Sequence, residues 1–277
     1  MRSILGLLLI AAVPAASPAL AQDIFQDGFE PGCPSSWSAA PGWSCVDGDA
    51  PVPGNPLVEE PGEGGCPAGM VRIAAAPDFC IDRFEASLID AGTSLPWSSY
   101  LRPGPGISVI ARSVRTATPQ GYIDQVTAGT ACNNAGKRLC TDAEWLRACR
   151  GPAGFTYPWG NAAEPGRCND ARAVHPAVEY YGTTDPWIWS HLDQPCLNQL
   201  PAGLERTGLR PGCVSAEGPM DMMGNLHEWT ADPNGTFRGG FYVDTVLNGP
   251  GCTYATTAHD VNHWDFSTGF RCCADSP

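Results

Sequence analysis

Histidine, carboxylate and aromatic side chains gather toward the C-terminal end of this 277-residue chain, where they could support metal binding or acid–base chemistry. His259 and His263 lie four residues apart, with Asp260 and Asp265 beside them. A helix would place both imidazoles on one face, as in some metal sites. However, the segment leads into WDFSTGF, which is typical of loop and strand, so we expect polar loop residues here.

A second stretch of interest is DMMGNLHEWT, residues 221–230. Its Gly-Asn pair predicts a tight turn with a carboxylate on each side. His227 lies within this turn segment and is either a surface residue or a substrate contact. Sequence order alone does not establish a Ser-His-Asp arrangement, and no phosphate-binding loop is present.

The N-terminus predicts an export signal. Arg2 forms a short positive region, ILGLLLIAAV an apolar region, and ALA before Gln22 a small-residue cleavage site. We therefore expect residues 1–21 to be a signal peptide and the mature protein to be secreted or periplasmic, the alternative being an uncleaved anchor. The apolar run is too short for a bilayer, so no membrane span is expected.

All 13 cysteines follow this signal, and in an exported protein they are expected to form disulfides. An odd number leaves at least one thiol unpaired or paired with another chain. Cys33 and Cys45 could close a small local loop, and Cys66 and Cys80 could join a hairpin. The net charge of −13 argues against a nucleic-acid partner, because phosphate binding needs a basic surface.

The chain divides into a Pro/Gly-rich spacer, residues 22–65, and a main domain, residues 66–277. The whole chain contains 32 glycines and 27 prolines. This composition predicts many turns and few long helices. We expect strands at Met70–Ile73 and Phe79–Phe84, a helix over Tyr122–Ala135, and a second helix that begins with a capping box at Thr141. Two more short strands are expected in TFRGGFYVD and STGFRCC.

Six motifs occur in one order along the domain: GMVRI…FCIDRFEAS, AGKRLCTDAEWLRACRG, YPWGN, DMMGNLHEWT, FRGGFY and STGFRC. Together they resemble the formylglycine-generating enzyme, or sulfatase-modifying factor, domain over about residues 66–273, here as an exported bacterial-type member. The resemblance implies an α+β fold, a C-type-lectin-like variant with little regular secondary structure, stabilised by disulfides and calcium.

Calcium ligands follow from the resemblance. In the family the loop matching DMMGNLHEW binds calcium, which implies the side chains of Asp221 and Glu228 and the carbonyls of Gly224 and Leu226. Calcium prefers such oxygen ligands, and Trp229 would be a core anchor. The alternative is a plain turn with exposed acids. A second, weaker calcium site would use the following residues: Asn169, Asp170 and Asp185.

The resemblance also implies two disulfides, Cys132–Cys272 and Cys149–Cys252. Cys140 and Cys273 are then neighbours of the first pair, and we expect them to pair with each other. Cys168, Cys196 and Cys213 remain, and we expect one of these three to be the odd thiol.

The family's oxidase chemistry needs copper(I) held by two thiolates, and soft sulfur ligands suit this ion. At the two matching positions this chain has Asp244 and Gly249. Cys252 lies nearby but is assigned to a structural disulfide, so copper is not expected. The remaining route to an active site is a different pairing of motifs in which Cys252 and a neighbour such as Cys273 bind copper.

We therefore expect a non-catalytic, calcium-binding module for an unknown protein, peptide or glycan. A groove for this ligand would contain His227, Asp244, His259 and His263. The alternatives are a formylglycine-generating oxidoreductase that acts on a protein cysteine, and an accessory subunit of an exported enzyme complex.

Overall fold

The computed structural model describes residues 57–257 and 259–277, all of which belong to one compact unit. The predicted signal peptide 1–21, most of the predicted spacer 22–65 and the suggested Cys33–Cys45 pair lie outside the described residues. Contacts of the domain begin at Glu59, whose Oε1 atom accepts hydrogen bonds from Ser113 N and Lys137 Nζ.

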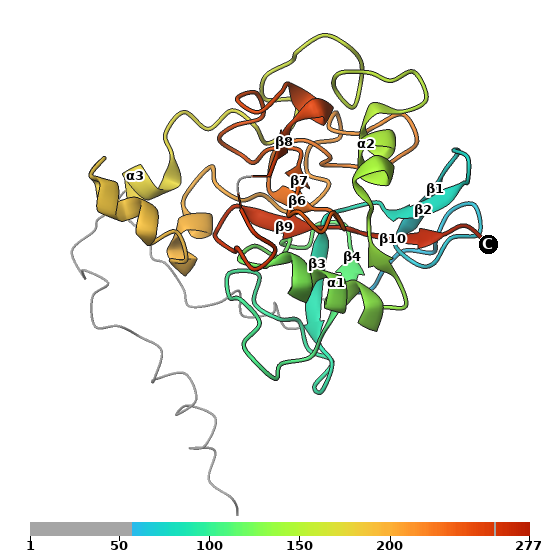
Figure 1. Cartoon of the computed structure of the whole chain (residues 1–277), viewed down its shortest axis with the longest axis horizontal. Coiled ribbons are helices and arrows are strands. Elements are labelled where there is room, and N and C mark those ends of the chain that lie inside the picture. Colours follow the sequence, from blue (N-terminus) through green and yellow to red (C-terminus); the bar gives the residue numbers. More distant parts are fainter. Residues whose placement is uncertain (1–56, 258) are drawn as a thin grey trace, which may run out of the picture. The chain divides into compact units, whose positions relative to one another are not determined.

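A four-stranded antiparallel sheet is built on the predicted hairpin (Figure 1). Its strands, in the order β1-β2-β10-β5, are β1 Met70–Ile73, β2 Phe79–Asp82, β10 Cys272–Asp275 and β5 Arg138–Leu139. The prediction of β1 is confirmed. Strand β2 ends two residues earlier than expected, although Phe84 is still buried.

Two further sheets complete the β structure. Strands β3 and β4 pair over five residues, whereas the third sheet has the order β8-β7-β6-β9 and one parallel pair, β6 with β9. The strands are β3 Ala86–Asp90, β4 Val109–Ser113, β6 His227–Trp229, β7 Phe237–Arg238, β8 Ala255–Thr256 and β9 Thr268–Phe270. The strand expected in STGFRCC is two strands, because the chain changes sheets at Arg271.

Helices α1 (Gln125–Asn134) and α2 (Asp142–Arg150) both lie where the sequence predicts them. Helix α1 starts later than expected because Tyr122 has a positive φ of 54° and Asp124 is the N-cap. The capping box of α2 is confirmed: Thr141 accepts from Glu144 N, and the Glu144 side chain accepts from Thr141 N.

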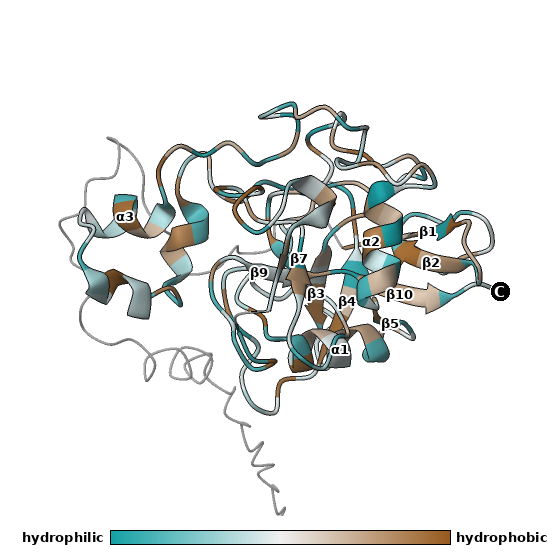
Figure 2. Cartoon of the chain, turned by 45° about the horizontal axis from the view of Figure 1, so that its top comes forward, coloured by the Kyte–Doolittle hydropathy of each residue, from teal (hydrophilic) through white to brown (hydrophobic). Residues whose placement is uncertain are grey.

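Short helices occupy the segment between α2 and β6, which the sequence described only as loop. They are α3 Pro176–Tyr181, η3 Pro186–Ser190 and η4 Pro195–Gln199, and a further turn, η5 Gly251–Thr253, follows β7. Figure 2 shows hydrophobic residues concentrated on strands such as β2 and β3 and polar residues along the loops. Trp229 packs in the core with Phe237 and Phe270, as expected of an anchor.

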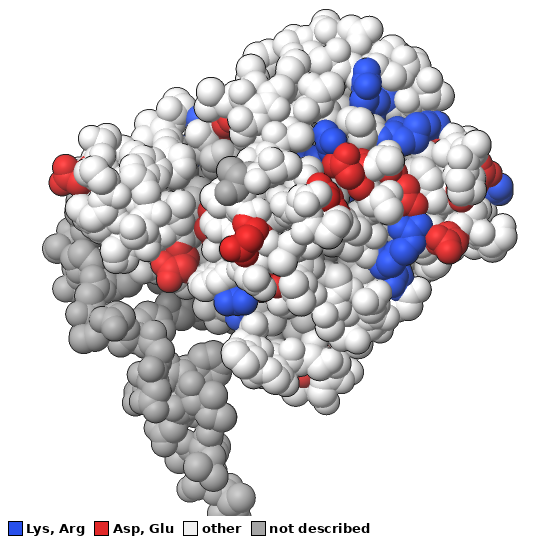
Figure 3. All heavy atoms as spheres, viewed as in Figure 1, with Lys and Arg blue, Asp and Glu red and all other residues white. Residues whose placement is uncertain are grey.

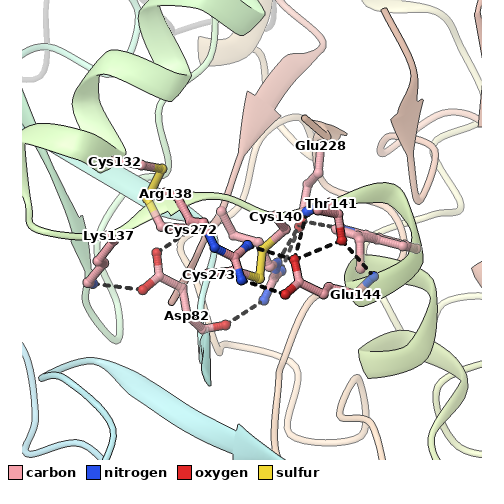
Figure 4. The surroundings of a disulfide bond; sticks show 12 residues. Asp82, Cys132, Lys137, Arg138, Cys140, Thr141, Glu144, Glu228, Cys272 and Cys273 are labelled. Carbon is pink, nitrogen blue, oxygen red and sulfur yellow. Dashed lines mark hydrogen bonds and ion pairs between the residues drawn. A yellow bond between two sulfur atoms is a disulfide. The ribbon is translucent and has the colours of Figure 1, made fainter. Parts of the chain in front are cut away.

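Disulfides connect these elements. Four predicted pairs are confirmed, and a fifth is added; they are Cys66–Cys80, Cys132–Cys272, Cys140–Cys273, Cys149–Cys252 and Cys168–Cys213. Figure 4 shows the two adjacent bridges that tie β10 to α1 and to Cys140, the residue that follows β5. Cys196 is disulfide-bonded as well. The prediction of a free thiol among Cys168, Cys196 and Cys213 is therefore wrong.

Stability near α3 should depend on pH through His175. Its Nδ1 atom caps the helix by accepting a hydrogen bond from Ala177 N at 3.2 Å, so a proton on Nδ1 would remove the acceptor. Burial lowers the pKa of His175 from 6.5 to about 4; Asp265 opposes this shift and Arg172 adds to it. The stability contributed by the neutral ring is therefore present above pH 6.5 and is lost as the pH falls toward 4.

Urea unfolding across this pH window tests the prediction. His175→Asn keeps a capping oxygen but does not titrate in this range. The variant should lose less stability than the wild type on acidification, by at most about 3 kcal/mol. Equal losses in the two proteins would contradict a role for His175.

Candidate functional site

The loop predicted to bind calcium wraps tightly before strand β6. Asp221, Gly224 and Asn225 all have positive φ, between 58° and 77°. A Cβ atom at Gly224 would lie 2.2 Å from the carbonyl oxygen of Asn169, so only glycine fits this position. The Asp221 carboxylate accepts a hydrogen bond from Gly208 N at 2.7 Å. In this conformation the Asp221 carboxylate is buried, and Leu226 N reaches the buried Glu85 carboxylate.

Asn225 and Glu85, which the sequence did not predict as site residues, hold this loop in place by hydrogen bonds. The Asn225 amide donates to Glu85 Oε2 at 2.6 Å, and its oxygen accepts from Asn169 Nδ2 and Glu205 N. The fully buried Glu85 also accepts from Leu226 N at 3.1 Å. The Gly-Asn pair in the sequence could have identified Asn225 as a turn residue. Only the structure shows that the Asn225 side chain bonds to Asn169, Glu205 and Glu85.

Glu228 is held in a buried ion pair. Arg271 donates to both of its carboxylate oxygens, with Nε–Oε2 and Nη2–Oε1 distances of 2.6 Å. Trp145 of α2 adds a 2.6 Å hydrogen bond from Nε1 to Oε2. Both Arg271 and Glu228 are at most 1% exposed. The predicted calcium ligand therefore already has a cationic partner within the protein.

The buried charges around the loop do not balance, because Arg271 is surrounded by three carboxylates. Burial raises the pKa of Asp221 to about 6, and the Glu228 charge acts in the same direction. Burial raises the pKa of Glu85 well above its ordinary range, with further contributions from Asp221 and Glu228. The cluster thus favours either a proton or an added cation.

The backbone oxygens of the loop fit a hard cation. Within the described part of the chain, no hydrogen bond to the carbonyl oxygen of Gly224 or Leu226 is found. Residues 57–257 and 259–277 contain no cluster of three or more His, Cys, Asp or Glu side chains suited to a metal. The predicted set has only two such side chains and two carbonyls, so it is compatible with this result.

The residues of the weaker calcium site are engaged with different partners. Asn169 Nδ2 donates to Gly203 O and Asn225 Oδ1, and Asp170 accepts from Gly166 N. Asp185 is exposed at the start of η3. Asn169 therefore contacts the loop of the first predicted calcium site, whereas its grouping with Asp185 stays a prediction.

The two positions that match the copper thiolates lie in a tight loop after β7. Asp244 Oδ1 accepts from Val246 N and Leu247 N, and Oδ2 accepts from the Tyr254 hydroxyl at 3.1 Å. Gly249 has a φ of 108°, and a Cβ there would lie 2.9 Å from Thr253 O. The loop is thus shaped for an aspartate and a glycine. Cys252 is bonded to Cys149.

The predicted groove histidines share one aromatic and polar cluster. His227 lies 3.4 Å from the Tyr254 hydroxyl through Nε2 and 3.1 Å from Ser267 Oγ through Nδ1. Burial lowers the pKa of His227 to about 4, so the ring is neutral at physiological pH. Burial and the Asp244 charge raise the pKa of Tyr254 to about 12. These groups form a hydrogen-bonded polar core beneath the loop.

His259 and His263 stack face to face with ring centroids 3.8 Å apart. Lone pairs of imidazole lie in the ring plane, so two stacked rings cannot direct them at one metal ion. His263 Nε2 instead lies 3.2 Å from Asp265 Oδ2, and His259 stacks on Phe237. The expectation of polar loop residues rather than a metal site agrees with this geometry.

The visible charged surface has no continuous basic area. Figure 3 shows Lys and Arg side chains beside Asp and Glu on one face of the molecule. Many of these charges form ion pairs, such as Arg138 with Glu144 and Arg238 with Asp142. Among the described residues, no helix is both long and apolar enough to cross a membrane.

Comparison with known proteins decides the family. The sulfatase-modifying factor enzyme 1-like domain matches residues 100–275. This chain belongs to that family. Its relatives include a mouse protein named inactive C-alpha-formylglycine-generating enzyme 2, which is 28% identical over 201 residues, covering 65% of this chain and 55% of the mouse protein. The formylglycine-generating enzyme of Streptomyces coelicolor is 29% identical over 243 residues, covering 74% of this chain and 67% of that enzyme.

Among solved structures, the chain is similar to PvdO from Pseudomonas aeruginosa. It has 15% sequence identity and a TM-score of 0.44, and the match covers 73% of this chain and 82% of that one. The family match, together with the short helices and sheets described above, confirms the predicted α+β, C-type-lectin-like fold. The chain spans about half the length of the mouse relative. Some of its relatives are named as formylglycine-generating enzymes and others as inactive members.

Removing Arg271 should strongly destabilise this family member. We expect Arg271→Met to cost about 3–5 kcal/mol, because the Glu228 carboxylate would stay buried without its counter-charge. The double variant Arg271→Met/Glu228→Met should be less destabilised than Arg271→Met. Urea unfolding measures both values.

A matched control is Arg72→Met, which removes an exposed ion pair with Asp78. It should change the free energy of unfolding by less than about 1 kcal/mol. Similar costs for Arg72→Met and Arg271→Met would contradict the central role of the buried pair.

Proposed function

We propose that this chain is an exported, non-catalytic member of the family that binds calcium and serves as a binding module. The observation that carries the proposal is the state of the thiols: all eleven cysteines of the described residues are disulfide-bonded. Copper(I) needs thiolates, and a disulfide sulfur is not one. The chain therefore lacks, in its described part, the ligands on which the oxidase chemistry of the resembling family depends.

The two altered positions support the same proposal. Asp244 uses its carboxylate to cap the loop backbone, and a hard carboxylate is a poor ligand for copper(I). Gly249 cannot become a cysteine without strain, because its φ and the nearby Thr253 carbonyl exclude a Cβ atom. A single substitution would not restore a thiolate pair.

For calcium, we propose a site formed by the Asp221 carboxylate, the carbonyls of Gly224 and Leu226, and Glu228 Oε1. The excess of buried negative charge and the unpaired carbonyl oxygens support it. When bound, the ion would balance charge and brace the loop. Glu85 would hold the loop backbone through Leu226 N and Asn225.

The alternatives to a binding module are an oxidoreductase of the formylglycine-generating type and an accessory subunit of an exported enzyme complex. The oxidoreductase alternative is supported by relatives that are named formylglycine-generating enzyme, such as the Streptomyces coelicolor protein. The accessory-subunit alternative rests on the fold alone.

Oxidase activity is tested with the full chain, copper and a cysteine-containing sulfatase-motif peptide. Mass spectrometry should show the peptide unchanged, because no thiolate pair holds copper. The Streptomyces coelicolor relative serves as the positive control. Conversion of the peptide thiol to an aldehyde by this chain would overturn the non-catalytic assignment.

Calcium binding is tested by thermal unfolding. Stripping with a chelator should lower the melting temperature by several degrees, and added calcium should restore it, since a ligand present at 100 times its Kd stabilises the native state by about 2.7 kcal/mol. Asp221→Asn should lose this response, whereas the control Asp244→Asn should keep it. An unchanged melting temperature together with no calcium by elemental analysis would contradict the site.

A further inference from the structure

The segment between α2 and β6 contains an open groove at the C-terminal end of α3. Its volume is about 620 Å³, and its lining combines two valines with polar groups. The lining residues are Val174, Val178, Glu179, Gly182, Thr183 and Thr184. None of them belongs to the calcium loop, the copper positions or the histidine cluster.

Two tryptophans lie just beyond this groove in the chain. Trp187 and Trp189, on η3, are 48% and 46% exposed, and they are the aromatic members of the exposed large hydrophobic residues within the described part of the chain. Trp187 makes edge contacts with Tyr181 at 5.0 Å and with His191 at 5.5 Å. Tyr181 directly precedes the groove residue Gly182. The indole is thus positioned by its neighbours although half of it faces solvent.

The polar groups of the groove retain capacity for hydrogen bonds. Thr183 Oγ1 accepts from Asp185 N, which leaves its hydroxyl proton available to a ligand. Within the described residues, no hydrogen bond to the Thr184 hydroxyl or to Glu179 Oε1 is found. The groove therefore offers two hydroxyl donors and a carboxylate acceptor beside the aliphatic surface of its two valines, and Trp187 packs on Tyr181, the residue before Gly182 of the lining.

The charges at the groove favour a neutral ligand. The nearest cation, Arg172, donates to Glu179 Oε2 at 2.5 Å, Val174 O at 2.8 Å and Pro201 O at 2.5 Å, and its side chain is only 5% exposed. The Arg172 guanidinium is therefore not available to a phosphate, sulfate or uronate. The unshared Glu179 oxygen and the exposed Asp185 would repel an anion.

We propose that this groove binds a neutral saccharide, with Trp187 or Trp189 stacked on the apolar face of a sugar ring. Sugars carry hydroxyls that pair with carboxylate and hydroxyl groups, and C–H faces that pack on indole and valine. This site lies apart from the proposed calcium loop and does not depend on it. Saccharide binding should therefore persist in the presence of a chelator.

The experiment uses the full chain and short neutral oligosaccharides of glucose, mannose and N-acetylglucosamine, titrated by calorimetry with and without chelator. We expect one series to bind, and Trp187→Ala, Trp189→Ala and Thr184→Val to weaken binding, with at least one tryptophan variant weakened about tenfold or more. Leu247→Ala, which truncates an exposed side chain outside the groove, is the control and should bind like the wild type. Circular dichroism checks that each variant is folded.

Several outcomes would overturn the proposal. One is no binding of any neutral oligosaccharide by the wild type, including the case in which the chain binds only a peptide. Another is equal affinity in the wild type and all three groove variants. Loss of binding on chelation would assign the saccharide to the calcium loop instead. None of these results bears on oxidase activity, so failure here is distinguishable from failure of the proposed function.

Discussion

The buried ion pair between Arg271 and Glu228 is the interaction on which the rest of the domain depends. Arg271 lies where the chain leaves β9 for β10, and its guanidinium also donates to Asp82 O and Met220 O. One side chain therefore connects two sheets, the 221–228 loop and, through Glu228 and Trp145, helix α2. Burying two charges is costly, and good geometry with additional hydrogen bonds is what makes such a pair tolerable.

The disulfides and the ion pair act on the same region by different means. Cys272 and Cys273 follow Arg271 directly and bond to Cys132 and Cys140, closing loops of 140 and 133 residues. Such long loops restrict the unfolded chain, whereas the ion pair acts in the native state. A domain with so little regular structure relies on both, because its short strands bury few backbone hydrogen bonds.

The loop around Asp244 and Gly249 is where this chain departs from the copper-binding pattern that the motif resemblance implies. The framework motifs fold as the resemblance implies, but the loop has become a turn capped by a carboxylate, with an apolar tip at Val246 and Leu247. The backbone as well as the side chains sets this loop, since Gly249 adopts a φ that a cysteine would find strained.

The sequence by itself determined the family, the hairpin, the start of α2 and four disulfides, because these depend on local signals and ordered motifs. The capping box at Thr141 needs only residues within one helical turn. Tertiary structure alone decided that Glu85 and Asn225 hold the 221–228 loop, that Cys168 pairs with Cys213, and that a groove forms beside α3. Those features join residues far apart in the chain, and no local pattern specifies which distant carboxylate, thiol or aromatic ring will meet when the core packs.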